Sequence, residues 1–224
     1  VVQANDDSPV TGLFRTLRNN LLFMLNEPNK KVVMVTSTVP GEGKTFTSIN
    51  LASVYSLLDK KTVLVGFDLR KPKIFEDFRL SNDKGVSTWL IGKDSLQDII
   101  QPTTYVNLSV IPAGPIPPNP SELTALQKTG ELITLLKERF DYIIIDSSPI
   151  AVVSDTLHLA SLADACLLVV RPGYTMRNVL EISLGEFSAS GTKDLSLVVN
   201  DISSRNQHYG YGGKYGYTSD AKGA

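Results

Sequence analysis

The sequence has one cysteine and almost no net charge, and each shortage excludes a class of protein. The single cysteine, Cys166, excludes a disulfide within the chain and any zinc or iron–sulfur site built from several cysteines of one chain. The 22 Lys and Arg residues nearly balance 23 Asp and Glu residues, which leaves a net charge of −1. Bulk electrostatic attraction to nucleic acid is therefore excluded, and we expect no nucleic-acid partner.

Long apolar runs are also lacking. None approaches the roughly 18 residues that a membrane-spanning helix needs. The chain begins Val-Val-Gln without a Met or a charged-then-apolar leader, so no secretory signal is visible. With 224 residues, 42% of them hydrophobic and 20% charged, the composition is that of an ordinary globular protein. We expect a soluble piece of a longer protein.

Short apolar runs alternate with helical patterns along the chain. Candidate strands are 32–35, 62–65, 108–111, 142–145, 165–170 and 195–199. Helical patterns occupy 8–27, 45–58, 123–139, 155–163 and 177–188. Strands that are apolar throughout belong to a parallel sheet covered on both faces. The pattern predicts a single doubly wound, mostly parallel α/β domain over about residues 1–205.

Three segments fall outside this alternation. Residues 111–120 are too rich in proline for a regular element and predict a rigid surface loop. The residues around Trp89 favour a small packed helix. Residues 209–224 hold four of the eight tyrosines and five of the 16 glycines, with almost no aliphatic residue. Such a segment buries too little apolar surface to offset its ordering entropy, so we expect a flexible tail over 206–224.

The strongest chemical signal follows the strand that begins at residue 32. A glycine loop with Gly41 and Gly43 leads into a helix start, which is the context that a phosphate-binding loop requires. Lys44 can reach the β- and γ-phosphates, and the Thr45 hydroxyl can ligate Mg²⁺. Thr38 stands where the usual pattern has its first glycine. We assign to the nucleotide the residues Val39, Pro40, Gly41, Glu42, Gly43, Lys44 and Thr45.

Two other strands end in an acidic residue. Asp146 follows Tyr142-Ile-Ile-Ile, and Asp68 follows Val63-Leu-Val-Gly-Phe. The carboxyl ends of parallel strands meet at one edge of a sheet, so both carboxylates should face the phosphate-binding loop. We expect Asp146 and Asp68 to share a Mg²⁺ ion. Arg70 can steady Asp68 or bind phosphate, and the plainer alternative is a surface pair of Asp68 with Arg70.

These elements together resemble the bacterial tyrosine kinases, or BY-kinases, of the deviant-Walker branch of P-loop proteins. The resemblance covers most of the chain. Residues 36–45 are similar to the family's Walker A motif, 63–70 to its Walker A′ motif and 143–149 to its Walker B motif. Segments 14–18, 117–123 and 169–173 also resemble family segments. The chain ends in the tyrosine cluster typical of the family, Tyr209, Tyr211, Tyr215 and Tyr217.

The resemblance implies an ATP-dependent tyrosine autokinase that uses Mg²⁺ and transfers the γ-phosphate to these tyrosines. Lys44, Asp68 and Asp146 would be its catalytic residues, and Thr45, Asp68 and Asp146 its metal ligands. In related P-loop proteins an asparagine at a strand end contacts adenine, which assigns Asn200 to the nucleotide. Arg171, also at a strand end, would contact the nucleotide or a neighbouring subunit.

The resemblance also implies partners and a location. Arg15 and Arg18 lie in the helix that family members use to form rings, so the chain's first partner would be itself. The others would be a membrane-embedded polysaccharide co-polymerase portion and a protein tyrosine phosphatase. Such kinases act at the cytoplasmic face of the bacterial inner membrane and regulate the synthesis or export of surface polysaccharides.

Two glycines depart from the family pattern and keep other functions open. Gly66 stands at the first of the two aspartates of the A′ motif, and Gly12 at the glutamate of the ring helix. One alternative is a ParA/MinD-like ATPase switch, although that branch has a lysine where this chain has Val39. The other is a nucleotide-binding adaptor with weakened catalysis, which Gly66 favours.

Overall fold

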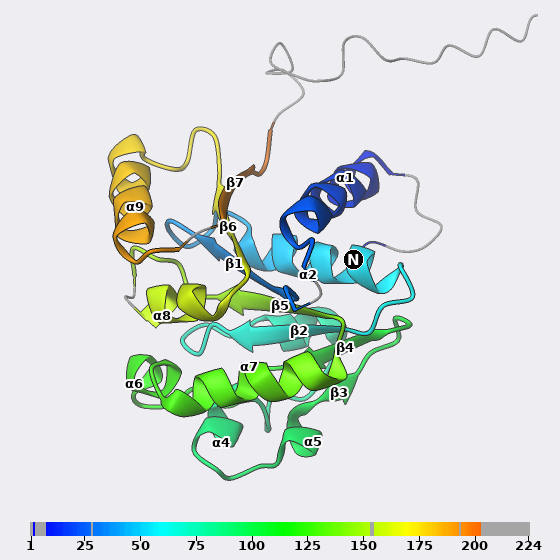
Figure 1. Cartoon of the computed structure of the whole chain (residues 1–224). Helices are drawn as coiled ribbons and strands as arrows, with labels where there is room; N and C mark the ends of the chain where they lie inside the picture. The colour runs from blue at the N-terminus through cyan, green and yellow to red at the C-terminus, as the bar shows by residue number, and fades with distance from the viewer. Residues whose placement is uncertain (1, 3–7, 28, 153–154, 193, 203–224) are drawn as a thin grey trace, which may run out of the picture.

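The computed structural model describes residues 2, 8–27, 29–152, 155–192 and 194–202, which form one sheet with helices on both faces (Figure 1). The strands are β1 Val32–Ser37, β2 Thr62–Phe67, β3 Gln101–Pro102, β4 Leu108–Ile111, β5 Tyr142–Ser147, β6 Ala165–Val170 and β7 Leu195–Val199. Their order across the sheet is β3-β4-β2-β5-β1-β6-β7. Every neighbouring pair is parallel except β3 with β4. The predicted parallel α/β fold is confirmed.

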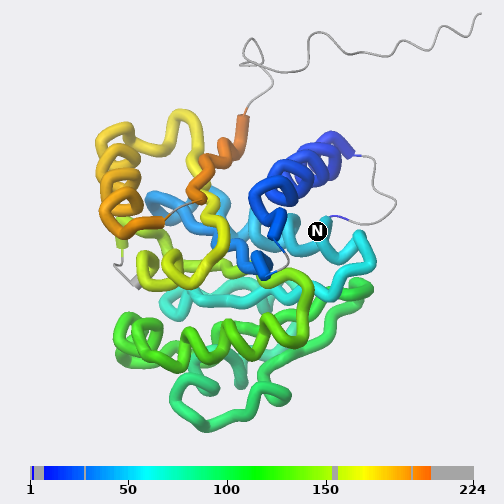
Figure 2. The backbone as a smooth tube through the Cα atoms, in the orientation of Figure 1, coloured from blue at the N-terminus to red at the C-terminus, as the bar shows by residue number. Residues whose placement is uncertain are grey.

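One face of the sheet is covered by α1 Pro9–Met24, α2 Lys44–Ser56 and the short α3 Ile74–Phe78. Their core residues, such as Phe14, Leu51 and Ile74, pack against alternate strand residues such as Val33. Figure 2 shows α1 in blue beside the last strand in orange. There the Ser196 hydroxyl donates to the Met24 sulfur at 3.7 Å, which ties the two ends of the described fold together.

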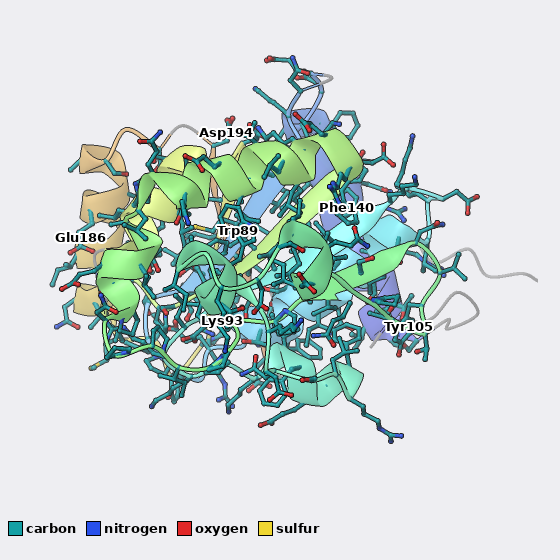
Figure 3. The ribbon with its side chains drawn as sticks, turned by 90° about the horizontal axis from the view of Figure 1, so that it is seen from below. Trp89, Lys93, Tyr105, Phe140, Glu186 and Asp194 are labelled. Atoms are coloured by element: carbon teal, nitrogen blue, oxygen red, sulfur yellow. The ribbon has the colours of Figure 1, made fainter. Side chains whose placement is uncertain are left out.

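The opposite face carries the remaining helices: α4 Val86–Leu90, α5 Leu96–Ile99, α6 Pro120–Thr124, α7 Gln127–Arg139, α8 Asp155–Leu162 and α9 Arg177–Ala189. Figure 3, seen from below, shows α7 crossing this face, with Trp89 labelled on α4 and Phe140 directly after α7. Trp89 packs against this second core, as expected for a small packed helix. None of the helices in the described part of the chain is long and apolar enough to span a membrane.

Several predicted boundaries are wrong. The first helix ends at Met24, and Leu13 on it is 70% exposed although its spacing matched the apolar face. The pattern over 123–139 is two helices, because the chain turns between α6 and α7. The proline-rich loop is shorter than expected, since Ile111 ends β4 and Pro120 starts α6, where a missing N–H costs nothing. The tail over 206–224 lies outside the described residues.

Candidate nucleotide-binding site

Three neighbouring strands, β2, β5 and β1, end at one edge of the sheet and carry the predicted site residues there. The glycine loop follows β1, Asp68 directly follows β2, and Asp146 is the second-to-last residue of β5. Asp146 is opposite Gly66 of β2 in the strand register. The Lys44 Nζ atom lies 3.9 Å from Asp146 Oδ1, so the prediction that both lie at the same edge is confirmed.

The glycine loop curls because two of its residues adopt a backbone that favours glycine. Gly41 has φ 92° and Gly43 has φ 100°, both in the left-handed region. Gly43 is also the N-cap of α2, so the free N–H groups and the positive end of the helix dipole face the loop. Thr38, at the position of the usual first glycine, is buried, and its hydroxyl donates to Glu42 Oε1 at 2.6 Å.

Lys44 lies between the two carboxylates. Its ammonium donates to Asp68 Oδ2 at 2.9 Å and to the Thr45 hydroxyl at 3.2 Å. The Thr45 hydroxyl in turn donates to Asp146 Oδ2 at 2.9 Å. The cluster therefore gathers a cation, a hydroxyl and two carboxylates at the start of α2, as the sequence predicted.

Two serines that the sequence analysis did not assign complete this cluster. The Ser48 hydroxyl donates to Asp146 Oδ1 at 3.1 Å, and the Ser148 hydroxyl donates to Asp68 Oδ1 at 3.1 Å. Ser48 follows Thr45 by three residues on α2, so helical spacing places both on one face. That spacing is the signal by which Ser48 could have been found. Ser148 has no comparable signal, because its contact depends on the pairing of β2 with β5.

The pKa values of the three charged groups shift in different directions. Burial acts to lower the pKa of Lys44, but Asp146 and Asp68 outweigh it and raise that pKa. Burial acts to raise the pKa of Asp68, but Lys44 and the hydrogen bonds it accepts lower that pKa overall. For Asp146 burial prevails and raises the pKa despite Lys44 and the hydroxyl donors. Asp68 is therefore the carboxylate whose charged form the site stabilises.

The oxygen atoms here suit a magnesium ion better than a transition metal. In the described part of the chain, no three His, Cys, Asp or Glu side chains cluster as a protein-only metal site. The Thr45 hydroxyl and Asp146 instead place hard oxygen donors beside the loop. Mg²⁺ is commonly held by one or two carboxylates, waters and the phosphates of its substrate. The donor set fits Mg²⁺ delivered with a nucleotide.

A cavity of about 320 Å³ opens over this cluster. It is lined by Pro40, Gly41, Gly43, Lys44, Thr45, Phe46, Asp68, Arg70, Lys71, Lys73, Ser148, Pro149 and Val152. Its cationic residues suit the negative charge of phosphate groups. Its apolar residues include the half-exposed Phe46 and Val152, which can contact an aromatic ring.

The alternative of a surface pair between the Arg70 and Asp68 side chains is wrong. The Arg70 guanidinium donates to the Ser121 hydroxyl at 2.6 Å. Asp68 instead accepts from the backbone N–H groups of Arg70 at 3.3 Å and Lys71 at 3.0 Å. Arg70 therefore steadies Asp68 through its main chain, while its side chain ties the segment after β2 to α6.

The two residues at the ends of β6 and β7 lie beside the loop. The Asn200 amide donates to the Glu42 carbonyl at 2.9 Å and packs so closely on Gly43 that a Cβ there would meet its nitrogen at 2.0 Å. Arg171 pairs with Asp201 at 2.6 Å and lies 5.2 Å from the centre of the Tyr174 ring. Asn200 thus contacts the loop directly, whereas Arg171 is linked to it through Tyr174, whose hydroxyl donates to the Pro40 carbonyl at 2.9 Å, and the assignment of both residues to the nucleotide stays a prediction.

Gly66 lies in a tight place in the sheet. A Cβ there would be 3.1 Å from the backbone nitrogen of Ala113 and 3.5 Å from Ile74 Cδ1. An aspartate at this position would therefore require its neighbours to move by a few tenths of an ångström. The fold therefore leaves little room for the aspartate that the A′ motif has at this position.

Arg15 and Arg18, the remaining predicted residues that the structure describes, lie on α1. The Arg18 guanidinium donates to the Val54 carbonyl at 2.9 Å, which holds α1 on α2. The Phe14 and Phe46 rings, 5.7 Å apart, also join α1 to the start of α2. Arg15 lies on the same helix, and the role of Arg15 and Arg18 in an oligomer stays a prediction. The four tail tyrosines lie outside the described residues.

Comparison with known sequences places the chain among proteins with this arrangement. A family model described as an AAA domain matches residues 30–207. The tyrosine-protein kinase YwqD of Bacillus subtilis is 35% identical over 201 residues, which cover 89% of this chain and 85% of that protein. The tyrosine-protein kinase wzc of Salmonella typhimurium is 36% identical over 93% of this chain, which spans only 29% of that relative's length.

Solved structures give the same result for the fold. The kinase domain of the Escherichia coli tyrosine kinase ETK superposes with a TM-score of 0.86 at 31% identity, covering 95% of this chain and 84% of that one. The septum site-determining protein MinD of Pyrococcus horikoshii, solved with Mg-ADP, gives 0.64 at 20% identity over 76% of this chain and 70% of that one. The second likeness shows the P-loop fold alone.

Proposed function

The chain belongs to the family of bacterial tyrosine-protein kinases, and from that membership we propose that it transfers the γ-phosphoryl group of Mg-ATP to tyrosines of its own C-terminal segment. The observation that carries the proposal is the cluster of Lys44, Asp68 and Asp146 at the start of α2. The acceptors are Tyr209, Tyr211, Tyr215 and Tyr217.

The nucleotide binds with its phosphates in the loop of residues 39–45. Backbone N–H groups and the α2 N-terminus hold the phosphate oxygens, and Lys44 places its charge on the β- and γ-phosphates. Asn200 and Arg171 contact the remainder of the nucleotide from the strand ends beside the loop. Thr45, Asp146 and Asp68 would hold the Mg²⁺ ion that accompanies ATP, and the chemistry that this ion would supply is positive charge beside the transferring group.

Asp68 orients the acceptor. A free phenol has a pKa near 10, so at neutral pH the tyrosine must lose its proton as it attacks. The phenolic oxygen forms a bond to the γ-phosphorus, the bond from that phosphorus to the bridging oxygen breaks, and ADP leaves. The charged Asp68 carboxylate accepts a hydrogen bond from the phenol and so orients it, and the phenolic proton passes to solvent as the new bond forms. With Gly66 in place of an acid, Asp68 is the carboxylate that faces the cavity for this role.

In the cell, we propose that the chain works at the cytoplasmic face of the inner membrane with a membrane-embedded polysaccharide co-polymerase portion. A protein tyrosine phosphatase would reverse its reaction. The family motifs support this context, and the Salmonella relative is a much longer protein that contains a matching region. Cross-linking in intact cells tests the association: recovery of this chain without any membrane protein contradicts it.

A second candidate, a nucleotide-binding adaptor with weakened catalysis, is favoured by Gly66. The motif lacks one of its two acids, and a Cβ at this position would lie 3.1 Å from the Ala113 backbone nitrogen, so an aspartate there would require that backbone to shift slightly. This candidate predicts tight Mg-ADP binding with no tyrosine transfer. The first candidate predicts both.

The experiment compares four proteins incubated with Mg-ATP and assayed for phosphotyrosine. We expect labelling of the wild type, none of Lys44→Met, none of a variant with all four tail tyrosines changed to Phe, and normal labelling of Lys30→Met. Lys30 is the matched control because it pairs with Glu27 at 3.1 Å, at the other end of the strands. Labelling of Lys44→Met at the wild-type level would refute the assignment of the loop.

A further inference from the structure

Glu42, a residue inside the phosphate-binding loop, is completely buried. Its carboxylate accepts hydrogen bonds from the Thr38 hydroxyl at 2.6 Å, from the Val39 N–H at 2.9 Å and from the Thr175 hydroxyl. Within the described part of the chain, no Lys or Arg forms an ion pair with it. Burying a carboxylate that is bonded only to neutral donors costs free energy of folding. The position of Glu42 in the loop therefore implies a compensating role.

Charge alone argues against a carboxylate at this position. The loop receives the phosphates of a nucleotide, and a negative group beside them repels them. Glu42 instead fixes the conformation of the loop. Its side chain joins residues 38, 39 and 42 of the same turn, so the loop is closed on itself before any ligand arrives.

The contact with Thr175 anchors this turn to a distant part of the chain. Thr175 lies between β6 and α9, 133 residues from Glu42. Its hydroxyl accepts from the Arg171 N–H at 2.8 Å, which leaves the hydroxyl proton for the Glu42 carboxylate. The same segment reaches the loop a second time, where the Tyr174 hydroxyl donates to the Pro40 carbonyl at 2.9 Å.

We propose that Glu42 is a positioning residue that holds the phosphate-binding loop in its curled form, with Thr175 as its anchor on the segment between β6 and α9. The Asn200 amide secures the other side of the turn through the Glu42 carbonyl. The inference rests on the nucleotide binding of the proposed function and not on transfer to tyrosine. It deepens that function by adding a group that shapes the loop without touching the phosphates.

The test measures the affinity for ADP with Mg²⁺ by calorimetry, without any acceptor. We expect Glu42→Ala to weaken ADP binding by about ten- to a hundredfold, since hydrogen bonds to a buried charged group are lost. Glu42→Gln should stay within about threefold of the wild type. Its amide oxygen can accept from Val39, and its NH₂ can donate to the two threonine hydroxyls. Wild-type ADP affinity in Glu42→Gln would show that the hydrogen bonds of this side chain, and not its negative charge, hold the loop.

Thr175→Val keeps the test decisive if Glu42→Ala fails to fold. We expect it to weaken ADP binding by about tenfold. Its control is Thr129→Val, which removes another buried hydroxyl bonded within the chain, here to the Thr124 carbonyl at 2.8 Å, where α6 meets α7 on the face of the sheet opposite α2. A Thr175→Val protein that binds ADP like Thr129→Val overturns the proposal, as does a Gln variant as weak as the Ala variant. Wild type that binds ADP but never labels tyrosine refutes the proposed function and leaves this result standing.

Discussion

Two carboxylates, those of Asp68 and Asp146, flank Lys44, and they differ in the hydrogen-bond donors that surround them. Asp68 accepts from Lys44, from the Ser148 hydroxyl and from two backbone N–H groups, which stabilise its charged form. Asp146 is buried and, among the residues that the structure describes, its carboxylate accepts short hydrogen bonds from the hydroxyls of Thr45 and Ser48 alone, with the Lys44 Nζ atom 3.9 Å away. These surroundings support the proposed roles, in which Asp68 orients the acceptor and Asp146 holds the metal ion.

Asp146→Asn should change the Mg²⁺ dependence of ADP binding but hardly change the stability of the fold. The amide removes a charge whose burial is unfavourable and can still accept from Thr45 or Ser48, so the free energy of unfolding without ligand should change by less than about 1 kcal/mol. ADP affinity should no longer respond to added Mg²⁺. Urea unfolding and ADP titrations with and without Mg²⁺ measure both quantities. A variant that keeps the wild-type response to Mg²⁺ contradicts the assignment of Asp146.

Cys166 should be chemically inert in the folded protein. It lies in β6 with 1% of its surface exposed, and burial raises the pKa of its thiol to about 12. Because the thiolate is the reactive form, only about one thiol in ten thousand would be ionised at pH 8 even if reagent reached it. A colorimetric disulfide reagent should react slowly in buffer and at once in guanidinium chloride. Rapid reaction in buffer would show that β6 is accessible.

The burial of Glu42 could not be predicted from the sequence. In the sequence Glu42 is a charged residue between two loop glycines, a setting typical of exposed side chains. In the fold it is buried and its carboxylate accepts from Thr175, which lies 133 residues away in the sequence. Lys44 was predictable because it follows the glycine loop at the start of a helix, and Asp68 and Asp146 because each ends or follows an apolar strand, a pattern that fixes the edge of the sheet where they lie.

At the scale of elements, the sequence predicts strands better than short helices. The bounds of β4, β6 and β7 match the expected 108–111, 165–170 and 195–199, because continuous apolar runs between polar segments fix both ends. The helices α3 and α5, of five and four residues, were not predicted, since so few residues show no helical period. The packing of the sheet, not intrinsic propensity, stabilises them.

The helix α1 should gain stability from a single methyl group. Gly12 lies in its interior, and a Cβ added there would have no neighbouring atom within 4 Å, so Gly12→Ala should add about 0.5–1 kcal/mol to the free energy of unfolding. Gly66→Ala is the contrasting variant. Its Cβ would approach the Ala113 nitrogen to 3.1 Å, so the free energy of unfolding should fall by about 1 kcal/mol. Urea unfolding of both variants checks the two signs, and a loss of stability in Gly12→Ala would contradict the account of α1.

For the whole molecule, the order of the strands creates the site. Because β5 lies between β1 and β2, the three motifs meet although residues 45 and 146 are 101 positions apart. The sequence predicted that the carboxyl ends of parallel strands meet at one edge of the sheet, but it did not predict the order of the strands. Apolar strands of similar length do not show in their sequences which strands they pair with. The right order follows only from how the connecting helices pack on the two faces.

Transfer between subunits is the prediction for the assembled protein. We mix a Lys44→Met chain that carries the tail with an active chain that ends at residue 202. If each tail enters a neighbour's site, phosphotyrosine appears on the inactive chain. A mixture in which neither chain is labelled, while the wild type labels itself, would leave only attack within one chain. Changing Arg15 and Arg18 to Ala should reduce the transfer if α1 joins the subunits.

The central claim is that the γ-phosphate goes to tyrosine, and a single-turnover measurement tests it most directly. The wild-type protein, in excess over Mg-ATP labelled in the γ-phosphate, is quenched at intervals, and the label is divided between inorganic phosphate and protein. The account predicts that most of the label becomes acid-stable phosphotyrosine on peptides containing residues 209–217. Release of all the label as inorganic phosphate, with none on protein, would contradict the account and identify a nucleotide switch.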